Sequence, residues 1–301
     1  MMRSMFSGIS GLRHHQTMMD TLASNIANVN TFGYKTSRVT FEDTLYQNLA
    51  GASGPSGNLG GTNAKQIGLG MTLGSIDNLM TQGAAQTTGV FTDIMIQGDG
   101  MFRVSSSAAT FNADNTKVQA AGAAESYTRA GNFSFDAEGF LVTQGGEYVL
   151  GDVDPGTAGI QVGRLQVNPL AFPSAVSVDG SGTLSYIAGV PGPYGPLGAA
   201  VAAGDTVTMG QMSLATFANQ AGLQRLGSNL WGETNNSGVP NMNIPGNGGA
   251  GSVLPGVLEM SNVDLALEFT NMIIAQRGFQ ANSRAITTSD EMLGELVNLK
   301  R

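Results

Sequence analysis

The side chains that could act in catalysis or metal binding are few, and the sequence does not group them. The only two histidines, His14 and His15, are adjacent and have no acid or cysteine close by, so we expect a solvated or packed pair rather than metal ligands. The chain contains no cysteine. A disulfide framework, a thiol nucleophile and a thiolate metal site are therefore excluded.

The acidic residues do not form a catalytic pair either. Glu42 and Asp43 are neighbours in sequence, as are Asp290 and Glu291, and neighbours on a helix point about 100° apart. Residues 151–159 (GDVDPGTAG) have two acids spaced like calcium ligands but lack the later Glu of a calcium loop. The sequence has no GxSxG, HExxH or P-loop motif. We therefore predict that the chain is not an enzyme and binds no metal or cofactor.

The composition indicates an exported assembly protein. Only 12% of the 301 residues are charged, 43 are glycine, and the net charge is −8. The 14 lysines and arginines are scattered, which argues against nucleic-acid binding because phosphate contacts need a basic patch. No apolar run approaches the roughly 18 residues that span a bilayer, so we expect no membrane insertion. The first residues lack an apolar signal-peptide core, so we expect export without a cleaved signal peptide.

The last forty residues predict one long helix with an apolar seam that needs a partner. The seam residues recur every seven positions: Leu265, Met272, Phe279, Ile286 and Leu293. Phe269 lies in a second row that polar residues interrupt. Ser261 or Asn262 is the expected helix cap.

A matching seam at the N-terminus suggests that partner. Its members are Met5, Leu12, Met19 and Ile26, with Ile9 in the second row. Two seams of the same kind at opposite ends of the chain predict an antiparallel, coiled-coil-like helix pair. The alternative is two ordinary surface helices that pack on a globular core. The segment between the helices is poor in long apolar runs, which weakens that alternative.

The middle of the chain predicts an inserted antiparallel β domain, so the fold class is α+β. Residues 133–142 and 177–187 alternate around Asp-Gly turns in the manner of hairpins. Residues 50–70 are rich in Gly, Ser and Asn, which on composition predicts a flexible linker or long loop. We expect three parts: a helical core (1–30 and 262–301), a junction with a long loop (31–80 and 229–261) and an outer β domain (81–228).

The junction has its own signals. Asn28 and Thr31 followed by Gly33 and Tyr34 predict a helix stop, because Asn and Gly tolerate a left-handed turn and the aromatic ring can fold back onto the last helical turn. The only tryptophan, Trp231, is the expected anchor between domains.

Several motifs resemble those of the bacterial flagellar rod and hook family. ANVNTFGYK at 27–35 is similar to the family's N-terminal signature, and residues 258–299 (LEMSNVDLALEFTNMIIAQRGFQ and onward) resemble its C-terminal pattern almost position for position. DIMIQGDGMFRV at 93–104 and YTRAGNFSFDAEGFLVT at 127–143 resemble its central region. The motifs occur in the family's order and cover well over half of the chain.

The resemblance implies a subunit of the flagellar hook, of the short Gram-positive type, through SRVTFEDTLYQ, GGTNAKQIGLGM and ELVNLKR. It implies a tubular homopolymer outside the cell, with the seam residues as subunit interfaces around an export channel. The implied partners are the distal rod protein, the hook cap, the hook–filament junction proteins and the flagellar type III export apparatus.

Two other functions remain open. A distal rod subunit is the near rival, because the 50–70 segment resembles an insert of the distal rod protein. A secreted β-domain binding module, such as an adhesin, is a candidate from another class. It would be a monomer with ordered termini, whereas filament termini should be unstructured before assembly.

Overall fold

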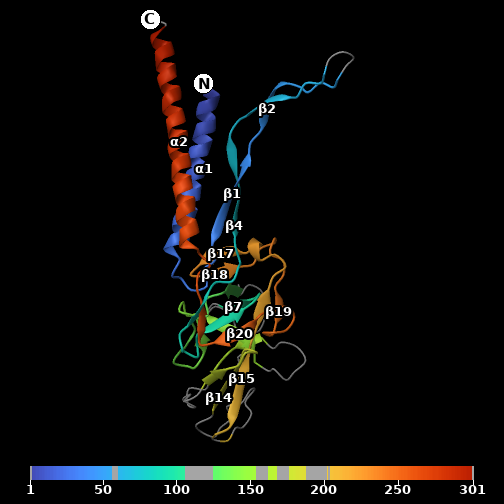
Figure 1. Ribbon diagram of the computed structural model, residues 1–301. Helices are drawn as coiled ribbons and strands as arrows, with labels where there is room; N and C mark the ends of the chain where they lie inside the picture. Colours follow the sequence, from blue (N-terminus) through green and yellow to red (C-terminus); the bar gives the residue numbers. More distant parts are fainter. Residues whose placement is uncertain are drawn as a thin grey trace. The chain divides into compact units, whose positions relative to one another are not determined.

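The computed structural model describes residues 2–55, 60–105, 125–153, 162–167, 176–187, 202 and 204–299. These residues form two units (Figure 1): one is Met1–Val29, Thr36–Leu79 and Val263–Arg301, and the other is Asn30–Lys35 and Met80–Asn262. The first is called the helical unit and the second the β unit. No helix within the described ranges is long and apolar enough to cross a membrane. The three-part division predicted above assigns residues 31–80 differently and stays a prediction.

The helical unit contains the two terminal helices, α1 (Met2–Ala27) and α2 (Leu265–Asn298). The cap of α2 is Asp264, whose carboxylate accepts hydrogen bonds from the backbone N–H groups of Ala266 (2.9 Å) and Leu267 (3.3 Å). The predicted cap at Ser261 or Asn262 was therefore wrong by two or three residues. An Asp cap also places a negative charge at the positive end of the helix dipole, which favours this start.

The helices run antiparallel and approach closely at glycines. A β-carbon added at Gly8 would lie 3.2 Å from Ile286, and one added at Gly11 would lie 2.5 Å from the Asn282 side chain. On the other helix, a β-carbon at Gly278 would lie 2.6 Å from the His15 ring. Because residue numbers rise on one helix as they fall on the other along these contacts, the pairing is antiparallel, as predicted. Supercoiling of the pair stays a prediction.

An antiparallel ribbon, here called the arm (residues 37–55 and 60–78), completes the helical unit. Its base pairs β1 (Ser37–Asp43) with β4 (Met71–Asn78), and its outer part pairs β2 (Tyr46–Ala50) with β3 (Lys65–Gly68). The arm's base lies beside α1, and its outer part extends away from the helices (Figure 1).

The loop predicted at residues 50–70 is wrong for Ala50 and residues 65–68, which lie in strands, while residues 51–55 and 60–64 form a loop that is joined by the bridge between Ser53 and Thr62. Polar side chains bond across the two strands instead of remaining solvated: Gln66 Nε2 donates to Asn48 Oδ1 at 2.5 Å, and Ser53 and Thr62 exchange backbone hydrogen bonds at 3.0 Å. Composition could not distinguish such polar cross-strand pairs from a loop.

The β unit is built from short strands. In chain order they are β5 (Ala85–Thr87), β6 (Ile94–Gln97), β7 (Met101–Ser105), β8 (Glu125–Thr128), β9 (Ser134–Phe135), β10 (Leu141–Val142), β11 (Tyr148–Asp152), β12 (Val162–Arg164), β13 (Val176–Val178), β14 (Thr183–Ile187), β15 (Thr206–Met212), β16 (Leu214–Thr216), β17 (Gln224–Gly227), β18 (Leu230–Gly232), β19 (Asn241–Asn243), β20 (Ser252–Pro255) and β21 (Val257–Glu259). The main sheet follows the order β13-β14-β15-β11-β7-β8-β18-β17. Its pairings are antiparallel, which confirms the α+β class.

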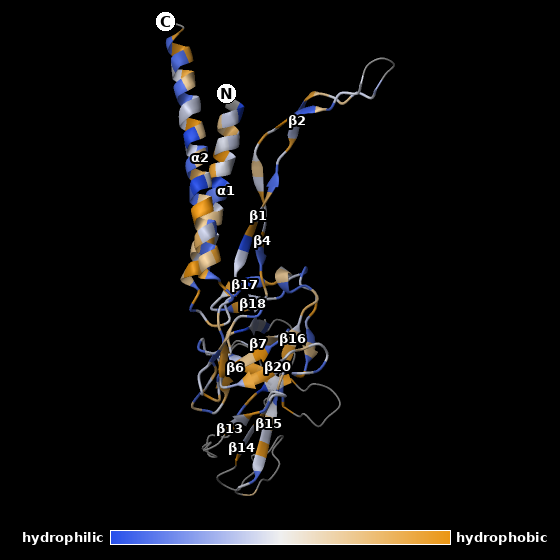
Figure 2. Ribbon diagram, viewed as in Figure 1, coloured by the Kyte–Doolittle hydropathy of each residue, from blue (hydrophilic) through white to orange (hydrophobic). Residues whose placement is uncertain are grey.

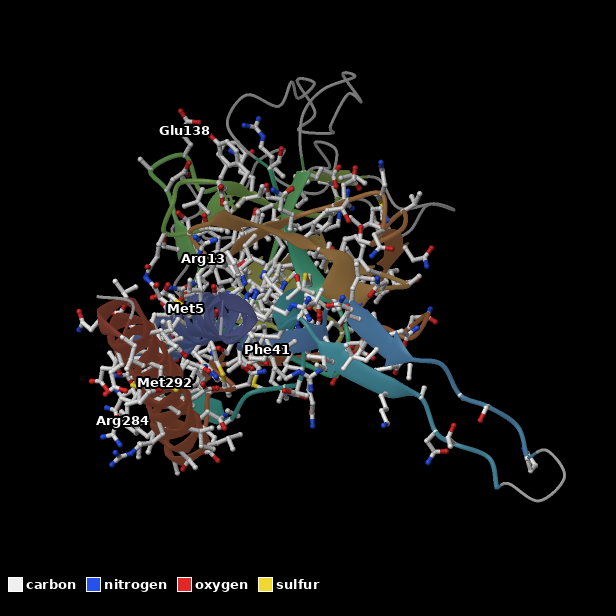
Figure 3. The ribbon with its side chains drawn as sticks, turned by 90° about the horizontal axis from the view of Figure 1, so that it is seen from above. Met5, Arg13, Phe41, Glu138, Arg284 and Met292 are labelled. Carbon is white, nitrogen blue, oxygen red and sulfur yellow. The ribbon has the colours of Figure 1, made fainter. Side chains whose placement is uncertain are left out.

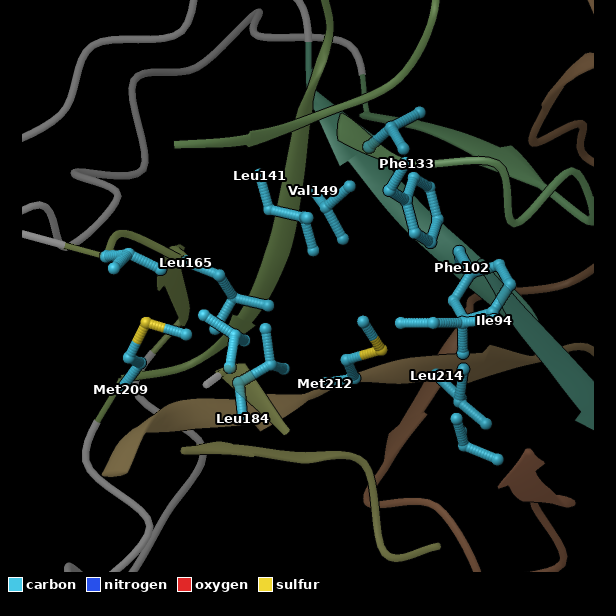
Figure 4. Close-up of a cluster of buried hydrophobic side chains, with 14 of the residues drawn as sticks. Ile94, Phe102, Phe133, Leu141, Val149, Leu165, Leu184, Met209, Met212 and Leu214 are labelled. Carbon is cyan, nitrogen blue, oxygen red and sulfur yellow. The ribbon is translucent and has the colours of Figure 1, made fainter. Parts of the chain in front are cut away.

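Both predicted hairpins are present. β9 pairs with β10 across the Asp136–Gly139 turn, and β13 pairs with β14 across the turn that contains Gly182. In each case alternating side chains reach the same core (Figure 4), where the rings of Phe102 and Phe133 meet edge to face at 5.1 Å. The hairpins are stable because one face of each is buried.

Figure 2 shows how apolar residues are distributed in each unit. In the β unit they gather on the inner strands, whereas on the helices apolar and polar residues alternate along the whole length. A second core cluster in the β unit surrounds Tyr127 and Trp231, both almost fully buried. The β unit thus has cores of its own.

Candidate functional site

The predicted seam residues divide into half-buried and exposed groups. Those half-buried within the helical unit are Met5, Leu12, Met19, Ile26, Met272, Phe279, Ile286 and Leu293. The exposed ones are Ile9, Leu265 and Phe269, of which Phe269 exposes half of its surface. Their assignment as subunit interfaces stays a prediction.

A second row of residues on α2, which its apolar pattern did not predict, also packs within the helical unit. It also has a seven-residue spacing and consists of Glu268, Ala275, Asn282 and Ser289, all buried or half-buried. Apolar periodicity could not reveal these residues, because they are small or polar. Their shared spacing with Leu265, Met272 and the rest of the seam was the one available signal.

Large apolar side chains remain uncovered on the helices. On α2 they include Leu267, Ile273, Ile274, Leu296 and Val297, each exposing half or more of its surface, and on α1 Phe6 is 65% exposed. Soluble monomers rarely expose so many large apolar side chains on paired helices. The helical unit therefore has the surface of a protein that is completed by neighbours.

The arm has one apolar face. Leu45, Leu49, Ile67 and Leu69 are all exposed. In the register of the ribbon, Gln47 pairs with Ile67 and Asn48 with Gln66, so that Ile67 lies with Gln47 on one face and Asn48 on the other. Leu49, two residues after Gln47, follows on the first face, where the register shifts between Asn48 and Ala50. A two-stranded ribbon alone is only marginally stable in water, so this face also calls for a partner.

A buried ion cluster anchors the segment after α1 in the β unit. Lys35 Nζ donates to Glu259 Oε1 at 2.6 Å and to the Thr81 carbonyl at 2.8 Å, while Arg129 Nη1 donates to Glu259 Oε2 at 3.1 Å. Burial lowers the pKa of Lys35, and the Glu259 carboxylate opposes that effect. The partners are far apart in sequence, so no local pattern indicated the cluster.

Three of the predicted junction residues, Gly33, Tyr34 and Trp231, lie near this cluster in the β unit. Gly33 has a φ of +68°, and a β-carbon there would lie 2.6 Å from the Ala130 nitrogen, so both its conformation and its surroundings require glycine. Arg225 stacks between the Tyr34 ring (4.8 Å) and the Trp231 ring (4.9 Å). The stack binds the segment 30–35 to the β unit.

The remaining junction residues have local roles. Asn28 donates from its side chain to the Ser24 carbonyl at 2.9 Å, at the end of α1, and the Thr31 carbonyl accepts from Tyr34 at 3.4 Å in the following turn. These contacts form the turn expected after the helix. A role for Trp231 between domains stays a prediction.

Asn25 ties three elements of the helical unit together. Its Nδ2 donates to the Ser37 carbonyl (2.8 Å) and to Glu268 Oε1 (3.3 Å), and its Oδ1 accepts from the Ser37 N–H (3.1 Å). Asn25 is completely buried. One amide thus joins α1, α2 and the first residue of the arm.

The histidines pack rather than gather ligands. His14 and His15 are half-buried, with ring centroids 6.2 and 6.3 Å from that of Phe41, which lies on the strand beside α1 (Figure 3). The described residues contain no group of three or more His, Asp or Glu side chains able to hold a metal ion.

Three family models match the chain. They are described as flagellar basal body rod FlgEFG protein C-terminal (residues 254–299), flagellar hook protein FlgE/F/G D1 domain (residues 95–186) and flagella basal body rod protein (residues 5–35).

Similar proteins span the full chain. The flagellar basal-body rod protein FlgG of Bacillus subtilis is 45% identical over 302 residues, covering 100% of both chains. FlgG of Borreliella burgdorferi is 34% identical over 303 residues, again covering all of both. The flagellar hook protein FlgE of Treponema pallidum is 30% identical over an alignment of 478 residues that covers both chains completely.

Proposed function

Because the chain belongs to the flagellar rod and hook family, we propose that it is the distal rod protein of the flagellar basal body. The supporting observation is the end-to-end match with the Bacillus subtilis rod protein, in which 302 aligned residues account for all 301 residues here. The alignment with the Treponema hook protein extends over 478 positions, so that protein contains much sequence that this chain lacks. The rod assignment thus replaces the hook assignment as the first candidate.

In this proposal the exposed apolar helices build the wall of a tube. Each copy offers different patches to different neighbours, and such heterologous contacts generate an open helical polymer. The uncovered side chains of α2, such as Ile273 and Ile274, are buried only when neighbouring copies pack against them. The polymer would begin on the proximal rod and receive the hook at its far end, after export through the flagellar type III apparatus.

The arm is the second assembly element. Its apolar face (Leu45, Leu49, Ile67 and Leu69) covers part of another copy in the polymer, which stabilises a ribbon that is marginal alone. A stiff paired ribbon restricts sliding between copies more than a flexible loop does. This restriction fits a straight shaft that transmits torque.

Electron microscopy of basal bodies purified from a strain that lacks the gene tests the proposal. A truncated rod without a hook supports the distal rod assignment. A complete rod that ends at the cell surface without a curved extension contradicts it and supports a hook subunit. Intact flagella contradict both.

The hook subunit is the second candidate, because hook proteins of Treponema pallidum and Borreliella burgdorferi are each 30% identical over the whole chain. In that case the same polymer would bend, and it would act as a joint between rod and filament. The secreted binding module receives no support from these relatives.

A further inference from the structure

The Glu268 carboxylate is buried with one oxygen unsatisfied. Its Oε1 accepts from Asn25, but its Oε2 has no hydrogen-bond partner among the described residues. The residue is only 8% exposed. Burial raises its pKa, and the nearby Asp264 charge acts in the same direction, against the hydrogen bond from Asn25. A buried carboxylate oxygen without a partner is costly, so the structure calls for a donor or a cation at this point.

Glu268 also lines a cavity in the helical unit of about 110 Å³. The cavity lies among α1, α2, the first residues of β1 and the residue that follows β4. Its apolar lining includes Leu22, Val39, Leu79 and Leu267. This volume is several times what one water needs, yet well below the roughly 300 Å³ at which small-molecule pockets begin. Apolar walls with one buried acid suit the long stem and charged head of a single basic side chain.

The chain's own arginine at the cavity is already paired. Arg38 lines the cavity, but its guanidinium meets Asp77 at 3.5 Å and is 61% exposed. The helices, in contrast, have four arginines that form no ion pair with any described residue: Arg3, Arg13, Arg277 and Arg284. Of these, Arg284 projects from the side of α2 that faces away from α1 (Figure 3). The helical unit thus combines a buried acid without a cation and exposed cations without an acid.

We propose that this cavity is a socket for an arginine side chain from the helices of a second copy of the chain, with Glu268 as its counter-charge. The inference rests on the proposed function, because it requires a polymer. Arginine fits better than lysine, since its planar fork can satisfy a carboxylate oxygen and nearby hydroxyl groups such as that of Thr21 together. The socket would set the register between copies, which the apolar helix surfaces alone leave free to slide.

Cross-linking between two tagged copies tests the socket directly. The natural chain has no cysteine, so introduced thiols have no background. One copy carries Thr21→Cys at the cavity, and the other carries Arg3→Cys, Arg13→Cys, Arg277→Cys or Arg284→Cys. Both are expressed in cells that assemble flagella and are treated with a short bismaleimide. We expect a mixed-tag dimer for one of the four positions and none for Glu295→Cys, an exposed control on α2. Polymer without any such dimer overturns the proposal.

Substitution of the acid gives an independent test. Glu268→Gln keeps the size and the acceptor for Asn25 but removes the charge, so we expect the yield of assembled polymer to fall about tenfold or more, as for other desolvated charge pairs. Glu295→Gln should leave the yield unchanged. Exchange of charges, Glu268→Arg combined with Arg→Glu at the cross-linked position, should restore part of the yield, which a purely structural role of Glu268 would not allow.

The outcomes separate the two proposals. Normal polymer from Glu268→Gln, together with no cross-link, means that the cavity holds only water and overturns the socket while the rod assignment stands. A complete rod in the deletion strain overturns the rod assignment, whereas a cross-link in a hook polymer would still support the socket.

Discussion

At the scale of single residues, the structure relies on buried charges that lie far apart in sequence. Lys35 and Arg129 both bind Glu259 inside the β unit, where their charges are almost completely shielded from water. Removal of Glu259 would leave two buried cations without an anion, whereas removal of Lys35 leaves the Arg129–Glu259 pair but deprives the carboxylate of one charged donor. The cluster therefore fixes the segment 30–35 through Lys35.

Replacement of Lys35 tests that attachment. We expect Lys35→Met to lower the free energy of unfolding by about 1–3 kcal/mol, because the Glu259 carboxylate and the Thr81 carbonyl then lose a buried charged donor. Lys65→Met, at an exposed lysine of the arm, is the matched control and should change it by less than about 0.5 kcal/mol. Urea unfolding followed by Trp231 fluorescence measures both. Equal effects of the two substitutions would contradict the role given to the cluster.

Glu268 predicts a pH dependence of the helical unit. Burial raises its folded-state pKa above that of the unfolded chain, so the folded state binds the proton more tightly. Its contribution to stability is therefore complete at pH values below the unfolded pKa and is lost as the pH rises through the folded pKa. As the pH rises through this range, the free subunit should lose stability relative to its Glu268→Gln variant, which stays uncharged; urea unfolding of both proteins at each pH measures this. A subunit that gains stability relative to Glu268→Gln with rising pH would refute the assignment.

At the scale of elements, the helix pair depends on glycine where the backbones approach. Gly278 faces the His15 ring, whereas a β-carbon at Gly294 on the same helix would meet nothing within 4 Å. The two glycines have the same intrinsic cost to the helix but opposite surroundings. They form a natural pair of test positions.

We expect Gly294→Ala to stabilise α2 by roughly 1 kcal/mol, since alanine is the better helix former. Gly278→Ala should lose that gain, because its new methyl group must displace His15. Thermal unfolding followed by circular dichroism at 222 nm measures both changes. Equal stabilisation by the two substitutions would mean that the helices are not in the close contact described.

The seam predicts an effect on assembly as well. Phe279→Asp places a charge at a half-buried seam position and should abolish polymerisation, whereas Thr287→Asp, at an exposed position of the same helix with polar neighbours, should be tolerated. Motility and electron microscopy of the flagellar base report the result. Normal rods from Phe279→Asp would remove this residue from the interface.

The helices and the two hairpins could be predicted because their signals are local and repeat along the chain, as Leu265 to Leu293 and the alternation before Gly139 illustrate. The arm could not be predicted, because the hydrogen bond between Gln66 and Asn48 depends on a strand register between residues eighteen positions apart. The burial of the row with Glu268 and Ala275 could not be predicted, because a polar or small residue in a sequence does not indicate whether it is buried. The Lys35–Glu259 pair escaped because no periodic pattern links residues so distant.

At the scale of the whole molecule, assembly depends on surfaces that a single copy leaves open. We expect Leu49→Asp combined with Ile67→Asp on the arm's apolar face to leave the free subunit folded but to prevent stable polymer, because these side chains are already exposed in the subunit. Asn48→Asp, on the opposite face, is the control. Sedimentation of assembled material from cells, with circular dichroism of the purified variants, distinguishes lost assembly from lost folding.

The pairing of Lys35 with Glu259 also has a consequence for the order in which the chain can fold. The two residues are 224 positions apart, and α1 likewise finds its partner only in the last residues of the chain. A chain that is synthesised from its N-terminus therefore completes neither contact until nearly all of it has been made. The interleaved topology places the completion of both units late in synthesis.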